Sequence, residues 1–200
     1  MKLYWAPNSR SLTLVWMLEE LGLPYERVHV DILLGAQDAP AYRAIHPMGK
    51  VPALVDGEMT VSEQGAICVW LADRFPEKKM APAIDDPARG DYLRWMFFEG
   101  NCIEPAFTEK ANGWSTKKSQ VGWGGYELVV DVIDNALKQR PWIMGDQFTA
   151  ADVMIGSAVN FGLAVKILEK RPSFEAYNAR VAARPAFIRT GELNKRAAAA

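Results

Sequence analysis

The feature that most constrains the fold of this chain is a change of pattern at residues 76–86. Before this segment, short apolar runs alternate with runs of helical spacing, in the order β-α-β-α-β-β-α. The segment itself, PEKKMAPAIDD, is rich in proline and charge and is typical of a linker. After it, every periodic run has helical spacing. The pattern predicts an α/β domain followed by an all-α domain, and 200 residues are enough for both.

We place the α/β domain at residues 1–77, the linker at 78–86 and the all-helical domain at 87–200. In the first domain, Gly22 followed by Pro24 is a strong helix stop, and Asp56-Gly57 is typical of the turn of a β-hairpin. The expected strands are residues 2–5, 25–30, 51–55 and 59–61. The expected helices are residues 11–21, 37–45 and 63–75.

The second domain is expected to begin with a long helix, with Pro87 in its first position. That helix should run to about Lys110. A further helix is expected within residues 119–139, after a glycine-rich lead. The remaining expected helices are 151–165, 173–183 and a short piece at 187–193, followed by a frayed alanine tail at 197–200.

Composition excludes several classes of function. The formal net charge is −1, so the chain lacks the basic surplus that binding to nucleic acid requires. No run approaches the roughly 18 apolar residues of a membrane span, and the first ten residues contain no secretory apolar region. The two cysteines form no C-x-x-C pair, and the two histidines have no metal-ligand spacing. We therefore expect a cytoplasmic protein without a metal site or a redox dithiol.

The segment Phe148–Val153 predicts a helix start. Thr149 and Asp152 form a pair resembling a capping box, and Phe148 can pack on Val153 as a hydrophobic staple. Its expected role is in folding, not chemistry. We also interpret His29, in a strand, and His46, before a proline, as structural.

Three segments carry a specific resemblance. They are MKLYWAPNSRSLTLVWMLEELGLPYE, HPMGKVPALVDGEMTVSEQGAICVWLADRF and PWIMGDQFTAADVMIGSAV. In this order and spacing they resemble the glutathione transferase family, especially its bacterial cytosolic members, over nearly the whole chain. The resemblance implies a thioredoxin-like N-terminal domain, a helical C-terminal domain, glutathione as co-substrate and a homodimer.

Two short segments then become candidate glutathione contacts. In the family the proline that matches Pro52 is cis. It leaves the backbone of the preceding residue, here Val51, free to pair with the cysteinyl unit of glutathione. The simpler interpretation is a structural proline at the start of an edge strand. Lys50 is a candidate to bind the glycine carboxylate of glutathione, or else it is simply a solvated lysine.

The step Glu63-Gln64 begins a helix, with Ser62 as its expected cap. Free N–H groups there could bind the γ-glutamyl carboxylate while Glu63 pairs with its ammonium group. Members of the family often have Glu-Ser at this step, whereas this chain has Glu63-Gln64. The second contact must therefore come from the side-chain amide of Gln64 or from the backbone alone.

The turn PNSRS is where the family places the residue that addresses the glutathione sulfur. Ser9 best matches the serine classes, and Ser11 is the alternative, or else simply the helix cap. Arg10 stands where the cysteine-type bacterial members have cysteine, and Trp5 stands where tyrosine often appears. A mixed-disulfide mechanism is therefore not supported.

The second substrate is less well specified. The first helix of the second domain is apolar on nearly all sides, which predicts burial on more than one face and fits a dimer. Candidates for an apolar pocket are Trp95, Phe98, Phe107 and Trp114, with packing as the alternative for each.

The expected activity is conjugation of the glutathione thiolate to small hydrophobic electrophiles, as in detoxification. Two alternatives remain. One is another glutathione-dependent reaction on the same scaffold, such as isomerisation, dehalogenation or disulfide reduction. The other is a protein that binds glutathione or another ligand without catalysis.

Overall fold

The computed structural model describes residues 1–198, which form two compact units by their contacts. One unit is Met1–Arg74 together with the chain from Ala183 onward, and the other is Phe75–Ala182. This grouping differs from the expected boundaries at the C-terminal end. Residues after 182 were expected in the helical domain, but their helix packs on the first unit.

Within the described residues, four strands form one mixed sheet in the order β2-β1-β3-β4. Strand β1 is central, parallel to β2 and antiparallel to β3, and β3 forms a hairpin with β4. The strands are β1 (Lys2–Trp5), β2 (Glu26–His29), β3 (Ala53–Asp56) and β4 (Met59–Ser62). All four predicted strands are present, within one or two residues of their predicted ends.

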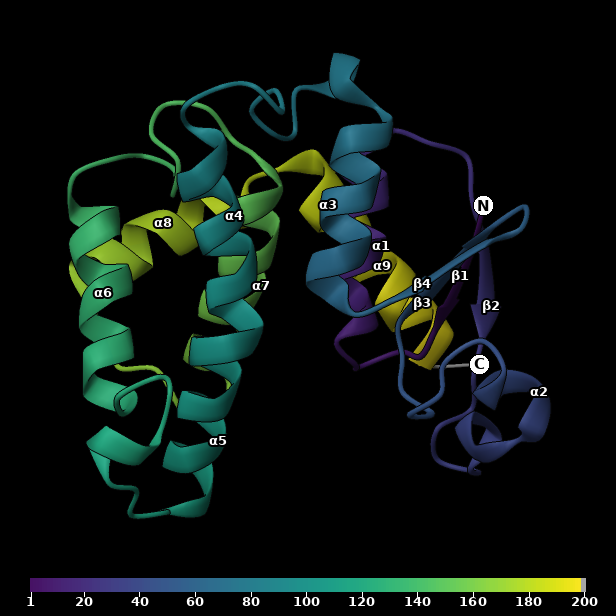
Figure 1. Cartoon of the computed structure of the whole chain (residues 1–200), viewed down its shortest axis with the longest axis horizontal. Coiled ribbons are helices and arrows are strands. Elements are labelled where there is room, and N and C mark those ends of the chain that lie inside the picture. Colours follow the sequence, from purple (N-terminus) through teal and green to yellow (C-terminus); the bar gives the residue numbers. More distant parts are fainter. Residues whose placement is uncertain (199–200) are drawn as a thin grey trace. The chain divides into compact units, whose positions relative to one another are not determined.

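Helices α1 (Ser11–Leu21) and α3 (Gln64–Arg74) pack on each other beside this sheet (Figure 1). Helix α1 ends at Gly22, which has the left-handed φ of 64° that glycine tolerates. The helix expected at 37–45 is instead a 3₁₀ turn (Ala36–Asp38) followed by a short α2 (Pro40–Arg43). The break falls at proline 40, which lacks the N–H needed to continue a helix from the turn before it.

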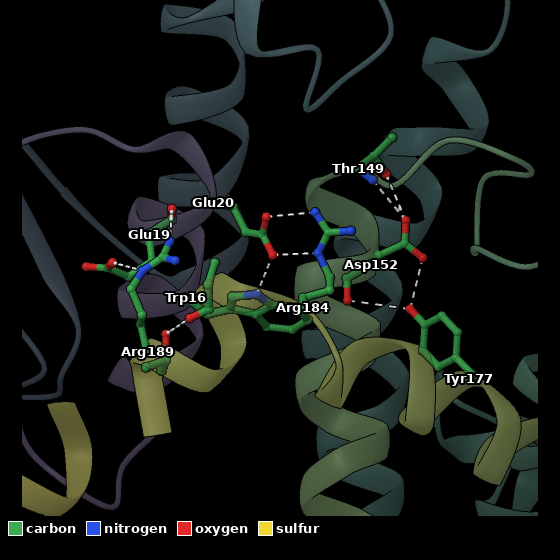
Figure 2. A network of polar contacts seen from close by, with 10 residues as sticks. Trp16, Glu19, Glu20, Thr149, Asp152, Tyr177, Arg184 and Arg189 are labelled. Atoms are coloured by element: carbon green, nitrogen blue, oxygen red, sulfur yellow. Dashed lines mark hydrogen bonds and ion pairs between the residues drawn. The ribbon is translucent and has the colours of Figure 1, made fainter. Parts of the chain in front are cut away.

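The C-terminal helix α9 (Pro185–Ala198) packs along α1 (Figure 1). Arg184 makes two hydrogen bonds to the Glu20 carboxylate, at 2.6 and 2.7 Å, and Trp16 Nε1 donates to the same carboxylate at 2.8 Å (Figure 2). Arg189 pairs with Glu19 at 3.0 Å. Glu20 is only 8% exposed, so its charge depends on these donors.

The second unit is built from helices, with additional 3₁₀ turns at Pro76–Lys78 and Lys118–Gln120. The helices are α4 (Arg89–Phe98), a π-helical turn (Glu99–Ile103), α5 (Glu104–Asn112), α6 (Tyr126–Lys138), α7 (Ala150–Ala164) and α8 (Pro172–Ala182). Helix α7 contacts both α4 and α8, and most of its residues are buried.

Helix boundaries in this unit differ from the predictions in ways that local chemistry explains. The first helix begins two residues after Pro87, where the Asp86 side chain accepts the N–H of Ala88 at 2.8 Å. The long helix expected to run to Lys110 contains the π turn just before Pro105, a residue that cannot donate to an ordinary α-helical ladder.

The end of the chain also differs from the prediction. Helix α9 is longer than the predicted piece at 187–193 and includes the first two alanines of the expected frayed tail. The last two, 199 and 200, lie outside the described residues.

The start of α7 confirms the predicted capping box. Asp152, fully buried, accepts hydrogen bonds from the N–H of Thr149 at 3.0 Å, the N–H of Ile143 at 2.7 Å and the hydroxyl of Tyr177 at 2.9 Å (Figure 2). Burial raises the pKa of the Asp152 carboxyl to about 6, although these hydrogen bonds oppose the rise. One carboxylate therefore connects the helix start, the loop before it and helix α8.

The capping network yields a stability prediction. Thr149→Ala should cost about 0.5–2 kcal/mol of unfolding free energy, the usual loss for a helix cap. Asp152→Ala should cost at least about 3 kcal/mol, because it removes the acceptor of two N–H groups and two hydroxyls, at roughly 1–3 kcal/mol for each donor left unpaired. Tyr177→Phe, which removes one donor, is the control, with a loss of about 1 kcal/mol. Urea denaturation measures all three, and an Asp152→Ala loss no larger than that of Thr149→Ala would contradict this account.

Candidate functional site

The register of the sheet brings the predicted site segments to one edge. Tyr4 pairs with Ala53 across β1 and β3, and Ala53 pairs with Ser62 across β3 and β4. The carboxyl end of β1, the amino end of β3 and the carboxyl end of β4 therefore lie side by side. The segments that follow or precede them hold Ser9, the Val51-Pro52 step and Glu63. The sheet thus gathers three separate parts of the chain in one place.

The two candidate serines have different surroundings. Ser9 is half-buried, and its hydroxyl lies 2.7 Å from the Ala6 carbonyl oxygen and 2.9 Å from Ser11 Oγ. Ser11 is 0% exposed, and its Oγ accepts the N–H of Ala6 at 3.4 Å. A hydroxyl has one proton, so Ser9 can donate to only one acceptor at a time.

Helix α1 begins at Ser11, so Ser11 is the first helical residue and not the cap that the sequence left open. The helix start is instead supported by Ser9, whose Oγ accepts the N–H of Ser11 at 3.2 Å. Of the neighbouring positions, Arg10 is exposed, while Trp5 is buried in the sheet with the Arg27 guanidinium 5.2 Å over its ring.

The Val51-Pro52 peptide bond is cis. Pro52 is buried, Val51 is half-buried and the Lys50 side chain is exposed. The carbonyl oxygen of Lys50 accepts a 2.5 Å hydrogen bond from the hydroxyl of Tyr42, a residue that is 6% exposed. Burial, with a smaller contribution from Tyr4, raises the pKa of Tyr42 to about 12, so this hydroxyl keeps its proton as a donor at neutral pH.

Gly49 shapes the same segment from the other side. It has a φ of 60°, and a Cβ there would lie 2.8 Å from the backbone oxygen of Gln37. Only glycine both tolerates this positive φ and lacks the Cβ that would collide with the Gln37 oxygen. Tyr42 and Gly49 are thus site-shaping residues that the sequence analysis missed, although Gly49 stands within the quoted segment HPMGKVPALV.

Glu63 lies between β4 and α3 with a φ of 69°, in the left-handed region that is costly for a residue with a side chain. Its carbonyl accepts the N–H of Ile67 at 3.0 Å, so Glu63 occupies the cap position that was expected for Ser62. Ser62 is the last residue of β4. The Glu63 side chain is exposed, and Gln64, the first residue of α3, is half-buried.

The four aromatic candidates for the second substrate have different environments in the helical unit. Trp95 is 2% exposed and packs edge-on against Phe98. Phe107 is 7% exposed and lies so close to Gly162 that a Cβ there would be 2.9 Å from its ring. Phe98 is half-buried, and Trp114 is 59% exposed.

The glycine-rich stretch before α6 is anchored to α5. The Glu109 carboxylate accepts hydrogen bonds from Trp123 Nε1 and the Thr116 hydroxyl, both at 2.6 Å. These two bonds hold the pKa of the Glu109 carboxyl below its ordinary value. These contacts hold the glycine-rich stretch to α5 at two points.

The described residues also bear on metal binding and on crossing a membrane. Residues 1–198 contain no cluster of three or more His, Cys, Asp or Glu side chains placed to hold a metal ion. Across the same residues, no helix combines the length and apolar character needed to cross a membrane.

Comparison with known families agrees with this geometry. The model of the glutathione S-transferase N-terminal domain matches residues 1–73, and that of the glutathione S-transferase C-terminal domain matches residues 124–185. The two matches span both structural units and most of the chain. The protein belongs to the glutathione S-transferase family.

Individual relatives agree. Glutathione S-transferase GstA of Escherichia coli O157:H7 is 28% identical over 194 residues, covering 92% of this chain and 94% of that protein. A ternary complex of BphK, a bacterial GST, aligns with a TM-score of 0.82 at 28% identity, over 98% of this chain and 100% of that one. A sphingomonad glutathione S-transferase complexed with glutathione aligns with a TM-score of 0.81 at 26% identity, over 98% of this chain and 99% of that one.

These findings confirm the predicted fold class, a thioredoxin-like domain with a helical domain, and the predicted enzyme class. The protein is a glutathione transferase with glutathione as its co-substrate. The residues that perform the reaction remain predictions.

Proposed function

We propose that Ser9 activates the glutathione sulfur and that the thiolate then attacks small hydrophobic electrophiles. The observation that carries this proposal is the difference in exposure between the two serines. Ser9 is half-buried at the open end of β1, whereas Ser11 is 0% exposed and has no surface to offer a ligand. The family assignment supports glutathione as the molecule that Ser9 meets.

The energy required is modest. A thiol of pKa about 8.5 is about 3% ionised at pH 7, and lowering the pKa to about 6.5 takes about 2.7 kcal/mol. One hydroxyl donating to a charged sulfur provides about 1.5–3 kcal/mol, and a helix start adds about 0.3–1 kcal/mol. Ser9, next to the start of α1, can therefore ionise the thiol without a metal or a general base.

The contacts of Ser9 suggest how its proton is delivered. The Ser9 hydroxyl is close enough to donate to the Ala6 carbonyl. Rotation about the Cβ–Oγ bond would redirect that proton to a bound sulfur and leave Ser9 Oγ in place, so that the buried Ser11 hydroxyl, 2.9 Å away, can donate to it. Such a donor polarises Ser9 and makes it a stronger donor in turn. Ser11 then assists Ser9 without touching glutathione.

The remaining contacts of glutathione follow from the sheet edge. The backbone of Val51, beside cis Pro52, would pair with the cysteinyl unit as an added strand. Glu63 would pair with the γ-glutamyl ammonium group, and the first N–H groups of α3, with Gln64, would bind its carboxylate. Lys50 has an exposed side chain that could reach the glycine carboxylate.

For the electrophile we propose Phe98 and Trp114 as contacts, because both have exposed ring surface. Trp95 and Phe107, also predicted for the pocket, are buried, so we assign them to shaping it from beneath. The thiolate forms a new carbon–sulfur bond. With an aryl halide, the halide departs with the electron pair of its broken bond to carbon. With an activated alkene, the π bond opens and the carbon that receives its electrons takes a proton from water.

We also propose that the protein acts as a homodimer in the cytoplasm. Phe97 on α4 is 64% exposed and Ile84 is 80% exposed, so apolar surface remains in the single chain. Both cysteines are free, as expected in a reducing compartment. Sedimentation at micromolar concentration should show twice the 22.3 kDa chain mass. A single-chain mass at all concentrations tested would reject the homodimer. Recovery of the protein outside the cytoplasmic fraction would reject the cytoplasmic location.

Replacement of the serines tests the mechanism. Ser9→Ala should raise the pKa of the bound glutathione thiol by about 1–2 units and lower the rate at pH 7 about ten- to a hundredfold, with partial recovery at higher pH. Glutathione affinity should change little. Ser11→Ala is the matched control, with a smaller pKa rise and some loss of stability. Ultraviolet titration of the bound thiolate measures the shift, and a larger effect in Ser11→Ala would reverse the roles.

Glutathione binding tests the γ-glutamyl site. A ligand at a hundredfold excess over its Kd stabilises the native state by about 2.7 kcal/mol, so millimolar glutathione should raise the melting temperature. Glu63→Ala should largely abolish that rise, because it leaves the ligand ammonium group unpaired. Glu58→Ala, at the opposite end of the β3–β4 hairpin, should retain it. If glutathione raises the melting temperature of both variants equally, Glu63 does not bind the γ-glutamyl ammonium group and this site assignment is wrong.

A panel of electrophiles separates the alternative activities. Conjugation of glutathione to aryl halides or activated alkenes supports the transferase assignment for this chain. Binding of glutathione without turnover of any conjugation, isomerisation, dehalogenation or disulfide substrate would favour a binding protein instead.

A further inference from the structure

The turn that carries Ser9 is held from the far end of the chain. The backbone N–H of Asn8 donates to Asn194 Oδ1 at 2.9 Å, and Asn194 Nδ2 donates to Asn8 Oδ1, also at 2.9 Å. The two residues are 186 positions apart in the sequence. A single side-chain amide on α9 therefore binds both the backbone and the side chain of the residue just before Ser9.

Asn8 is held in an unusual conformation. Its φ is 53°, in the left-handed region that residues with a side chain adopt at a cost, although asparagine adopts it more easily than most. A change of backbone angles at position 8 would turn the whole of Ser9 relative to the sheet edge. The conformation of Asn8 thus sets the direction of the Ser9 Cα–Cβ bond, and with it the region that the Ser9 hydroxyl can reach.

Asn194 is itself on a fixed support. Helix α9 is attached to α1 by the two-bond pair between Arg184 and Glu20 and by the edge-on contact of Phe187 with Trp16, whose ring centres are 4.9 Å apart. Asn194 lies two helical turns beyond Phe187. A rigid helix can hold a partner group in place more precisely than a loop can.

We propose that Asn194 is a positioning residue for catalysis: it holds Asn8 in the left-handed conformation and so directs the Ser9 hydroxyl at the glutathione sulfur. Asn194 makes no contact with substrate in this role. The inference rests on the proposed function of Ser9 and extends the site to a residue near the end of the chain. It also makes α9 part of the glutathione-activating unit.

The test compares variants on both sides of the contact. Asn194→Ala and Asn8→Ala should each raise the pKa of the bound glutathione thiol by about half a unit to one unit and lower kcat at pH 7 about three- to tenfold. KM for glutathione should stay within about twofold, since the sites on β3 and α3 are untouched. Lys195→Ala, exposed on the same helix, is the control and should match the wild type.

The substitution Asn8→Gly distinguishes an effect on the position of Ser9 from an effect on the stability of the fold. Asn8→Gly also removes the side chain, but glycine adopts a positive φ without strain. In the Asn194→Ala background, Asn8→Gly should therefore restore at least half of the lost kcat and thiol pKa shift. A purely structural contact would not be rescued, because glycine adds no bond and loosens the chain.

The outcomes are distinct. If Ser9→Ala lowers the rate but Asn194→Ala and Asn8→Ala leave kcat and the thiol pKa unchanged, this inference is wrong and the proposed function stands. A lower melting temperature or a higher KM with an unchanged kcat would likewise assign the contact to stability alone. If Ser9→Ala has no effect, the proposed function fails, and the inference fails with it.

Discussion

The site depends on the register of a small mixed sheet. Strand β1 pairs with β2 on one side and with β3 on the other, in opposite directions. That single arrangement places the end of β1, the start of β3 and the end of β4 at one edge. A shift of one residue would turn the side chains of a strand to the other face and move its end away from the other two. The buried residues of the strands, such as Leu3 and Leu54, stabilise the register because their side chains must face the core.

At this edge the chain adopts conformations that are unfavourable in isolation. Asn8 and Glu63 both have positive φ, which is costly for residues with a side chain. Such conformations persist where surrounding contacts over-determine them, and they collect at functional sites. Here each one lies beside a predicted glutathione contact. The rest of the fold supplies the contacts that hold them, including the two hydrogen bonds between Asn194 and Asn8.

The two structural units do not follow the order of the sequence. Helix α9 comes after the whole helical unit but packs on α1 with the ion pairs Arg184–Glu20 and Arg189–Glu19. Glu20 lies in a helix that is largely buried, and an unpaired carboxylate there would be costly. Arg184 and Trp16 satisfy it. The first unit therefore requires the end of the chain to complete its polar contacts.

Local patterns determined much of this protein. Alternating apolar runs predicted the four strands, and Gly22, the Asp56-Gly57 turn and the Thr149 capping box predicted where elements begin and end. These features depend on neighbours a few residues away, so a linear sequence contains them. Quoted motifs also led to the glutathione transferase family and to its candidate site residues. Segments with competing local signals, such as the run interrupted by Pro105, were predicted less well.

Contacts between distant residues were decided only by the tertiary structure. Nothing in the pattern of the last 15 or so residues indicates that Asn194 meets Asn8, because the pairing follows from how α9 lies on α1. Burial likewise distinguished Ser9 from Ser11, two serines that the local sequence could not rank by accessibility. The sequence determined which residue types and turns were available for a site. The packing of helices and the register of strands decided which of them meet, since those depend on interactions summed over the whole chain.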